Sequence, residues 1–390
     1  MKKNILLFCD NFYPQVDGVA KVVYNYAHEF NKTDYCGVVV PNFHKPLGKH
    51  CDFDVFLKNN FNLRLPGTIA PINLADKKLT KILLDKKPDI IHCHSPFAIG
   101  HYGLKIAKKL GVPVVATFHS QFKYDLKEYV KSRLISWFVL RYIVRFFNKC
   151  DEVWAVSKPA AEMLKSYGFK KDIRIMTNGV DFEMPEDVDQ VKKNAIEEFK
   201  IDTTKKNIVY VGQLRKAKNI KLIMDTLHEI SKNRQDFHMF FAGNGVYERK
   251  MKKLAKKYKI AQNITLLGSI KSREKLTGLL LNSDVFFFPS TYDTFSLVVR
   301  EACVCKLPVL LTKGSGASDG FIDGKNGFLA DENVESMAEK LNFILDNPEK
   351  ARKCGEISGK TIPFYWNQLI PGVSEAYDEL IKNNKKTSKE

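Results

Sequence analysis

Two acidic residues flank a short helical segment in the last third of the chain. Asp293 lies in the loop after a dense apolar run, 285–288, and Glu301 follows eight residues later on the body of the predicted helix. The apolar run is typical of a buried strand that ends at a turn. Acids at the carboxyl ends of parallel strands can bind the hydroxyl groups of a polar ligand. A plain strand–loop–helix with exposed acids is the alternative.

Cations gather at another junction between a strand and a helix. Arg215, Lys216 and Lys218 lie between a predicted strand, 208–212, and a predicted helix, 220–231. Backbone N–H groups at a helix start and flanking cations favour the binding of a diphosphate. A solvated lysine cluster is the alternative.

Three candidate functional residues follow predicted strands of the N-terminal half. Gly18 lies between a strand, 5–9, and a helix, 20–30, where the backbone can approach a phosphate or a sugar. His94 and His119 come at the carboxyl ends of two later predicted strands, where parallel sheets bind ligands. A plain turn for the glycine and structural roles for the histidines remain open.

The segment 125–149 combines basic and aromatic side chains. Arg141, Arg145 and Lys149 recur every four residues and so share one helical face. The same segment supplies bulky apolar area through Trp137, Phe138, Tyr142 and Phe146. A basic stripe beside aromatic residues is typical of a helix that lies in an anionic interface. A core helix with a solvated basic edge is the alternative, and both descriptions can hold at once.

Composition points to a two-domain globular protein with an anionic partner. A chain of 390 residues is long for one core. The net charge of +18 indicates a membrane surface, nucleic acid or phosphorylated substrates, unless it reflects a general lysine bias. No nucleic-acid-binding module is recognisable, so we expect no nucleic-acid partner.

Cysteine usage and the start of the chain indicate a cytoplasmic protein. The eight cysteines are scattered without zinc-ribbon spacing, which predicts buried thiols in a reducing compartment. The apolar run 5–9 meets Asp10 at once, as a first strand does and a signal peptide does not. No apolar run reaches the length that spans a membrane.

Strands alternate with helices along the chain, which predicts α/β architecture with parallel, doubly wound sheets. The alternation restarts after a charged linker, 182–205. We therefore predict an N-terminal domain (1–180), a C-terminal domain (181–362) and a final helix with a tail (363–390). Residues 43–75 are predicted to be irregular.

The order of these features resembles retaining glycosyltransferases of family 4. Their donor site carries Pro-Ser-x-x-Glu-x-Phe-Gly and a second Glu eight residues after the first, and residues 289–301 follow this pattern. Further similarities are Gly18, the Thr-x-His ending at His119, the boundary at 178–181, Lys218, the Gly-x-Gly of Gly243 and Gly245, and the Asn-Gly pair 326–327. The resemblance implies the GT-B fold: two Rossmann-like domains that face a cleft, with the last helix crossing back to the N-terminal domain.

The resemblance also implies a reaction and its site residues. The implied reaction moves a hexose, with glucose favoured, from a nucleotide diphosphate sugar such as UDP-glucose, with retention and without a metal or cofactor. The implied catalytic residues are His119, Lys218, Asp293 and Glu301. The implied donor-binding residues are Gly18, Gly212, Arg215, Gly243, Gly245, Phe295, Ser296 and Leu297.

The acceptor side is similar to glycolipid synthases that glucosylate diacylglycerol. This implies a membrane lipid or lipid-linked glycan as acceptor, and a bacterial enzyme of glycolipid or cell-surface polysaccharide synthesis. It also implies peripheral binding at the inner, anionic face of the cell membrane. The residues assigned to acceptor and membrane binding are His94, Trp137, Arg141 and Arg145.

Four positions depart from the family pattern. Asp293 is one carbon shorter than the usual Glu, Gln213 replaces an Arg, and Ser296 and Lys306 stand where Gly is common. These departures leave two other functions open. One is a sugar-nucleotide 2-epimerase of the same architecture, and the other is a non-catalytic glycan-binding subunit.

Overall fold

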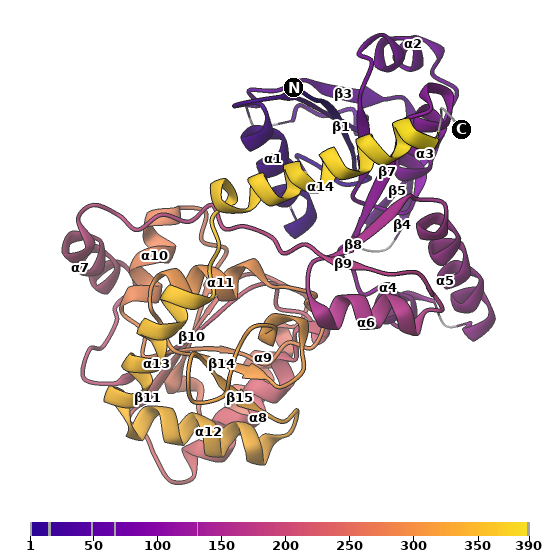
Figure 1. Cartoon of the computed structure of the whole chain (residues 1–390). Coiled ribbons are helices and arrows are strands. Elements are labelled where there is room, and N and C mark those ends of the chain that lie inside the picture. Colours follow the sequence, from indigo (N-terminus) through magenta and orange to yellow (C-terminus); the bar gives the residue numbers. More distant parts are fainter. Residues whose placement is uncertain (1, 15–16, 48–49, 66–67, 131, 388–390) are drawn as a thin grey trace. The chain divides into compact units, whose positions relative to one another are not determined.

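The computed structural model describes residues 2–14, 17–47, 50–65, 68–130 and 132–387. The chain forms two compact units, each built around a parallel sheet (Figure 1). Unit 1 comprises Met1–Gly179 and Phe364–Glu390, and unit 2 comprises Val180–Pro363.

The sheet of unit 1 has seven parallel strands in the order β3-β2-β1-β6-β7-β8-β9. Their bounds are Asn4–Phe8 for β1, Tyr35–Pro41 for β2, Val55–Lys58 for β3, Ile90–Cys93 for β6, Val114–Phe118 for β7, Glu152–Ala155 for β8 and Arg174–Ile175 for β9. The order reverses direction between β1 and β6, which pair from Ile5↔Ile90 to Phe8↔Cys93. Such a reversal is where open parallel sheets bind ligands.

The prediction that residues 43–75 are irregular was wrong for much of that range. Besides β3, it contains β4 (Asn60–Leu65) and β5 (Thr68–Asn73), which pair antiparallel as a separate two-stranded sheet. Residues 60–65 alternate polar and apolar side chains, a pattern typical of an antiparallel strand with one solvated face. The segment has no continuous apolar run, and the alternation was overlooked.

Seven helices of unit 1 lie within the described residues. They are α1 (Gly18–Phe30), α2 (Lys77–Asp85), α3 (Ala98–Leu110), α4 (Phe122–Tyr129), α5 (Arg133–Asn148), α6 (Lys158–Ser166) and α14 (Trp366–Thr387). The segment 125–149, treated as one unit in the sequence, is divided between α4 and α5. Val130 is extended, and Ser132 caps α5 by accepting a hydrogen bond from the Ile135 amide.

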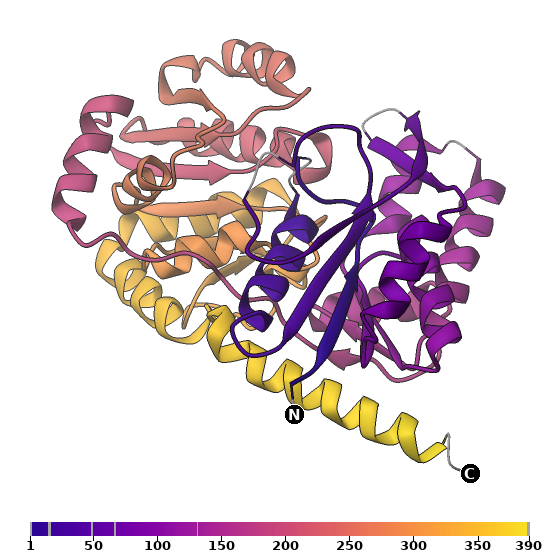
Figure 2. The ribbon, with the colours of Figure 1, turned by 90° about the horizontal axis from the view of Figure 1, so that it is seen from above.

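The C-terminal helix α14 is part of unit 1, as predicted (Figure 2). Its Tyr377 is fully buried and stacks on Trp154, with ring centroids 5.5 Å apart. The Tyr377 hydroxyl also bonds to Nδ1 of His92 at 2.6 Å, and Lys3 pairs with Asp378 at 3.1 Å. The core of unit 1 is therefore completed by residues from both ends of the chain.

The sheet of unit 2 has six parallel strands in the order β12-β11-β10-β13-β14-β15. Their bounds are Lys206–Val211 for β10, Phe237–Ala242 for β11, Ile264–Gly268 for β12, Val285–Phe288 for β13, Val309–Thr312 for β14 and Phe328–Ala330 for β15. The accompanying helices are α7 (Val188–Phe199), α8 (Ile220–Ser231), α9 (Glu248–Lys257), α10 (Arg273–Leu281), α11 (Leu297–Val304), α12 (Val334–Asp346) and α13 (Pro348–Thr361). The order reverses between β10 and β13.

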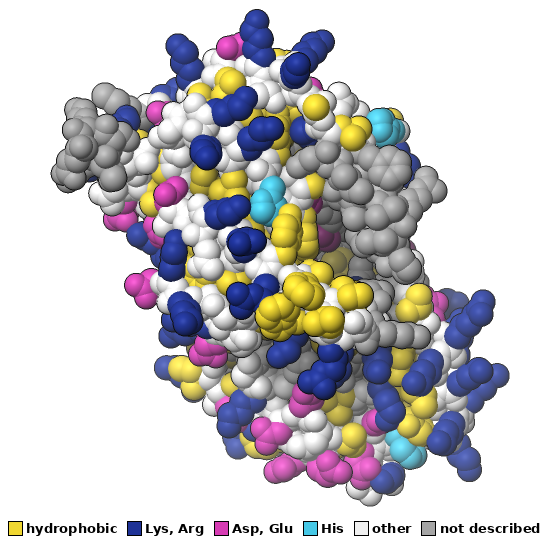
Figure 3. Space-filling view, turned by 90° about the vertical axis from the view of Figure 1, so that its right-hand side faces the viewer, with side chains coloured by type: hydrophobic (Ala, Val, Ile, Leu, Met, Phe, Trp, Pro, Cys, Tyr) yellow, Lys and Arg dark blue, Asp and Glu magenta, His cyan; other side chains and the backbone are white. Residues whose placement is uncertain are grey.

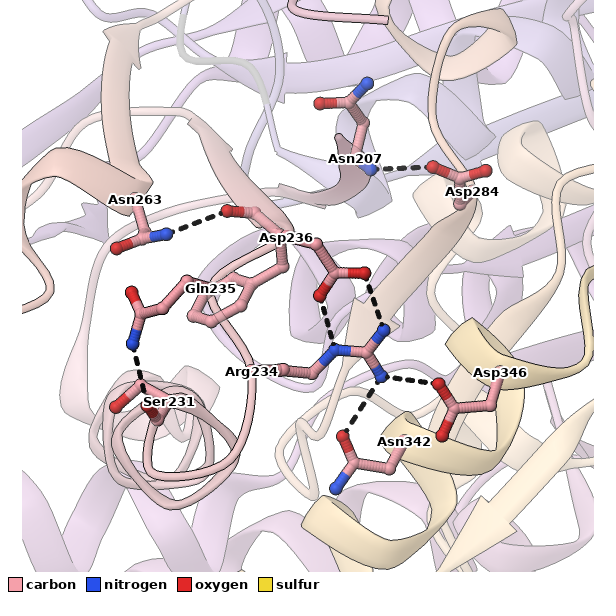
Figure 4. Close-up of polar contacts among 10 residues, drawn as sticks. Asn207, Ser231, Arg234, Gln235, Asp236, Asn263, Asp284, Asn342 and Asp346 are labelled. Atoms are coloured by element: carbon pink, nitrogen blue, oxygen red, sulfur yellow. Dashed lines mark hydrogen bonds and ion pairs between the residues drawn. The ribbon is translucent and has the colours of Figure 1, made fainter. Parts of the chain in front are cut away.

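The amino edge of this sheet is closed by a polar network (Figure 4). Arg234 donates to both carboxylate oxygens of Asp236 at 2.8 and 3.0 Å, and to Asp346 at 2.9 Å. Asp284 accepts from the Asn207 amide at 2.6 Å. These contacts tie together the segments that enter the strands, whereas open parallel sheets bind ligands at the opposite, carboxyl edge.

The two residues that replace family glycines both have left-handed backbone conformations. Ser296 has φ of 63° and Lys306 has φ of 57°. Residues other than glycine adopt this region at a cost of about 1 kcal/mol or more. The backbone therefore explains why glycine is common at these positions, and this chain keeps the conformation with a strained residue.

We expect Lys306→Gly to stabilise the protein by about 1 kcal/mol, because glycine relieves the strain at positive φ. Lys306 is exposed, so little packing is lost. Urea denaturation measures the free energy of unfolding. The control Lys306→Ala removes the same side chain but keeps a Cβ, and it should give no comparable gain; equal effects of the two variants would contradict the backbone explanation.

Candidate functional site

The predicted donor residues of unit 2 lie at the carboxyl edge of its sheet, beside the reversal between β10 and β13. The loop after β10 carries Arg215 and Lys218, and the loop after β13 carries Asp293. Crevices at such reversals are the usual ligand sites of open α/β sheets.

Lys218 and Asp293 form an ion pair across this reversal. Nζ of Lys218 lies 2.5 Å from Oδ1 of Asp293, and the Ser290 hydroxyl donates to Oδ2 at 2.6 Å. The two charged side chains are only 13% and 17% exposed. Both carboxylate oxygens are therefore engaged, and Asp293 fixes the ammonium group of Lys218. That ammonium has further protons that can bind an anion.

The ring of Tyr292 contacts a second cation, Arg215, next to Lys218. The Arg215 guanidinium lies 5.6 Å from the centre of the Tyr292 ring, and Nζ of Lys218 lies 5.3 Å from it. Gln213, which replaces the family Arg, is exposed, and its carbonyl accepts a hydrogen bond from Tyr210 at 3.0 Å. Arg215 is thus the cation that shares the Tyr292 ring with Lys218. Sequence reasoning did not identify Tyr292, although it lies inside the recognised motif.

Glu301 lies on the body of α11 and makes a different ion pair. Its side chain is 5% exposed, and its Oε1 accepts from Arg273 at 2.8 Å. Arg273 also donates to Asp181 at 3.1 Å. Neither partner was identified from the sequence, because no spacing rule connects three residues so far apart in the chain.

Arg300 holds the loop between Asp293 and Glu301. Its buried guanidinium donates to the carbonyls of Phe295 at 2.6 Å, Ala317 at 2.5 Å and Asp319 at 2.9 Å. It also lies 4.2 Å from the centre of the Phe295 ring. Burial lowers the pKa of Arg300 to about 10, which leaves it charged at pH 7. Phe295, predicted to bind the donor, is buried against this support.

The start of α11 has no side-chain cap among the described residues. The hydroxyl of Ser296, at the N-cap position, is buried and has no partner among them. The first amides of the helix, from Leu297 onward, can therefore donate to a phosphate.

Gly212, Gly243 and Gly245 allow two neighbouring loops to touch. A Cβ at Gly243 would lie 1.9 Å from the Gly212 carbonyl oxygen, and one at Gly245 would lie 2.2 Å from the Leu214 carbonyl oxygen. These clashes are with backbone atoms and cannot be relieved by rotating a side chain. Gly243 and Gly245 are thus required by packing of the loop after β11 against the loop after β10, whatever a ligand adds.

Three histidines lie in contact at the carboxyl edge of the unit 1 sheet. His94 and His119, both predicted site residues, share a hydrogen bond of 3.0 Å between Nδ1 and Nε2. The rings of His92 and His94 lie 4.0 Å apart, and His92 bonds to Thr117 at 2.7 Å. Burial lowers the pKa of all three, to about 3 for His119. They are therefore neutral at pH 7.

Asp10 and Gly18 lie beside the strand reversal of unit 1. Asp10 accepts from the Ile99 amide at 2.9 Å, its Oδ2 is buried without a partner among the described residues, and burial raises its pKa. Gly18 begins α1, after the cap Asp17. Apart from its chain neighbours and the backbone of its own helix, no described residue has an atom within 4 Å of a Cβ built at Gly18.

The helix α5 is divided into a buried half and an exposed half. Ile143, Val144, Phe146 and Phe147 are buried, so the predicted surface role of Phe146 was wrong. None of residues 133–142 is buried. Large apolar side chains that are 46–65% exposed are Leu134, Ile135, Trp137, Phe138 and Tyr142. Figure 3 shows a hydrophobic group among Lys and Arg side chains on the side where α5 lies.

Cations accompany the exposed half of α5. Arg141 and Arg145 are exposed, and the Arg141 guanidinium lies 5.1 Å from the centre of the Trp137 ring. We name this surface, formed by Leu134, Ile135, Trp137, Phe138, Arg141, Tyr142 and Arg145, the α5 face. In the described part of the chain, no helix is both long and apolar enough to span a membrane.

Comparison with known families matches both halves of the chain. Residues 16–184 match the model described as Glycosyltransferase Family 4, and residues 191–361 match the model described as Glycosyl transferases group 1. The alpha-monoglucosyldiacylglycerol synthase of Streptococcus pneumoniae (strain ATCC BAA-255 / R6) is 26% identical, over 78% of this chain and 70% of that protein. The enzyme of the same name from Acholeplasma laidlawii is 25% identical, over 98% and 99%.

Solved structures confirm the predicted fold. The crystal structure of Anabaena Alr3699/HepE in complex with UDP-glucose matches with a TM-score of 0.75. It is 16% identical, and the match covers 97% of this chain and 100% of that chain. At this identity the likeness shows the fold alone, and that fold is GT-B.

We expect His119→Gln to reduce the loss of stability in acid. The folded-state pKa of His119, about 3, lies below its ordinary value of 6.5. The unfolded chain therefore takes up the proton first, so the stability that neutral His119 contributes is full above pH 6.5 and is lost as the pH falls toward 3.

Urea denaturation between pH 7 and pH 4 measures this effect. The slope of unfolding free energy against pH should fall by up to about 1.4 kcal/mol per pH unit in the variant. The exposed His50, changed to Gln, serves as control and should keep the original slope. Identical slopes for His119→Gln and the original protein would contradict the assignment.

Proposed function

Because the chain belongs to the glycosyltransferases that combine a Family 4 domain with a group 1 domain, we propose that it transfers a hexose, with glucose favoured, from a nucleotide diphosphate sugar to a membrane lipid or lipid-linked glycan. The proposed reaction retains the configuration at the anomeric carbon and uses neither metal nor cofactor. The observation that carries the proposal is the Lys218–Asp293 ion pair at the strand reversal of unit 2, with Arg215 on the same aromatic ring.

Departure of the nucleoside diphosphate concentrates negative charge on its outer phosphate. Lys218 and Arg215 are placed to stabilise that charge, and the uncapped start of α11 adds backbone donors. Groups fixed before the reaction need no reorganisation as charge develops, which is how electrostatic stabilisation accelerates such steps. Asp293 serves in this scheme chiefly by holding Lys218 in place.

Glu301 in unit 2 and the histidines in unit 1 have separate roles in the proposed reaction. Glu301 is a buried carboxylate that can accept from hydroxyl groups of the donor ribose. The neutral His119 is assigned to the transferred sugar, and His94, which is hydrogen-bonded to it, to the acceptor side. A neutral imidazole both donates and accepts a hydrogen bond, which suits recognition of sugar hydroxyls.

The choice of donor and acceptor draws on the relatives. The HepE structure contains UDP-glucose, and both reported relatives are named for glucosylated diacylglycerol. The α5 face adds physical support, because exposed large apolar residues next to arginines favour an anionic lipid surface. We therefore favour UDP-glucose as donor, diacylglycerol or a glycolipid as acceptor, and peripheral binding at the inner face of a bacterial cell membrane.

A donor panel tests the reaction. Purified protein should release nucleoside diphosphate from one of UDP-, GDP- or ADP-glucose, in the presence of diacylglycerol or glucosyl-diacylglycerol in anionic vesicles and without effect of EDTA. Lys218→Met should lower kcat/KM by about 100- to 1,000-fold, because it removes a cation that stabilises the leaving phosphates.

The matched control is Lys221→Met. Lys221 lies three residues further on, in the first turn of α8, and pairs with Asp225 instead of a site residue. It should keep activity close to that of the original protein. Absence of release across all donors and acceptors would refute the transferase, while donor conversion without acceptor would favour the epimerase.

Binding to vesicles tests the α5 face. Arg141→Glu/Arg145→Glu should weaken binding to phosphatidylglycerol vesicles by about 30-fold or more, at about 1 kcal/mol for each cation, and added salt should weaken binding of the original protein. Trp137→Ser/Phe138→Ser should weaken the part of the binding that survives high salt.

The double variant Lys252→Glu/Lys253→Glu is the control for the change in net charge. These residues are exposed on α9 of unit 2, so the pair makes the same change in net charge without altering α5. Equal losses from the two charge reversals would show that net charge, and not the α5 face, governs binding.

A further inference from the structure

A bridge of side chains joins Glu301 to the segment through which the chain enters unit 2. Arg273, the first residue of α10, donates from one arm to Oε1 of Glu301 at 2.8 Å and from the other to Oδ1 of Asp181 at 3.1 Å. Its guanidinium also lies 5.3 Å from the centre of the Phe182 ring. The planar fork of an arginine suits such a two-ended contact, because its donors point in fixed directions.

Glu301 depends on this arginine for its charge balance. The Glu301 side chain is 5% exposed, and Arg273 is the sole cation among the described residues that forms an ion pair with it. A buried carboxylate is costly unless a cation and hydrogen bonds compensate it. Since Arg273 takes Oε1, and no described residue donates to Oε2, the second oxygen is left to accept a ligand hydroxyl.

The other end of the bridge lies at the junction between the two units. Unit 1 ends its first stretch at Gly179, and unit 2 begins at Val180. Asp181 is 42% exposed at its side chain, whereas Phe182 is fully buried. Phe182 therefore anchors the segment in unit 2, and the contact with Arg273 holds Asp181, the second residue after the boundary.

We propose that Arg273 is a positioning residue that couples nucleotide binding at Glu301 to the backbone of the junction, residues 179–182. The inference rests on the proposed function, since it takes Glu301 as the acceptor of ribose hydroxyls. A bound nucleotide fixes Glu301, Glu301 fixes the guanidinium, and the guanidinium fixes Asp181. Coupling of this kind is reciprocal. If the bound nucleotide stabilises the Asp181–Arg273 contact by a given factor, loss of that contact weakens nucleotide binding by the same factor.

Hydrogen exchange of the junction, followed with and without a saturating nucleoside diphosphate, measures the coupling. UDP, GDP and ADP are compared by calorimetry, and the tightest is used. In the original protein the nucleotide should slow amide exchange in peptides that cover residues 178–184 by about threefold or more. In Arg273→Gln it should bind about 10-fold more weakly and, once saturating, leave exchange at the junction unchanged.

Further variants separate coupling from general stability. Asp181→Asn should weaken nucleotide binding by about threefold, and combined with Arg273→Gln it should add no further loss. Lys275→Gln serves as control, because Lys275 is on the same helix but pairs with Glu198; it should behave as the original protein. Arg273→Lys, which keeps the charge and loses the fork, should bind the nucleotide yet lose most of the exchange effect, and it replaces Arg273→Gln if that variant does not fold.

The outcomes distinguish this inference from the proposed function. If none of the three nucleotides binds the original protein, the proposed function falls and the inference falls with it. If a nucleotide binds and protects the junction equally in the original protein and in the Arg273 variants, the coupling is wrong while the proposed function stands.

Discussion

The ion pair between Lys218 and Asp293 is the contact on which the rest of the candidate site depends. It joins the loop after β10 to the loop after β13, at the only reversal of strand order in the sheet of unit 2. Where the connections from two adjacent parallel strands run in opposite directions, a crevice forms at the carboxyl ends of those strands. An ion pair placed across that crevice fixes both loops and keeps a cation with protons to spare at its edge.

The surrounding residues support this pair in different ways. Ser290 takes up the second oxygen of Asp293, and Tyr292 presents its ring to both Lys218 and Arg215. Behind the loop, Arg300 binds three backbone carbonyls and so holds the strained residue Ser296 in place. Burial of the Arg300 charge, which has no carboxylate partner among the described residues, costs free energy. In return, its hydrogen bonds to carbonyls fix one conformation of a loop that lacks regular structure.

Sequence reasoning reached the architecture and the motif residues for clear physical reasons. Apolar runs such as 285–288 and glycines such as Gly243 are local signals, and they predict strands and close turns without knowledge of the fold. Arg273, Arg300 and Tyr292 were not predicted as site residues, because their importance comes from contacts with residues distant in the chain. The antiparallel strands β4 and β5 were missed for a different reason: they carry no continuous apolar run, and their signal is the alternation of polar and apolar residues over 60–65. In α5 the sequence indicated both a core helix and an interfacial one, and burial shows where along the helix the first gives way to the second.

The contribution of α14 to unit 1 has a consequence for how the protein is made. Tyr377 packs with Phe30 and Trp154, so the first core to be synthesised is the last to be completed. Residues 180–363 are all available before α14 emerges from the ribosome, and domains generally fold as they are synthesised. Unit 2 can therefore reach its native state early, while unit 1 waits with an apolar surface uncovered until residues 366–377 arrive. During that interval the nascent chain is a natural client for chaperones that shield apolar surface.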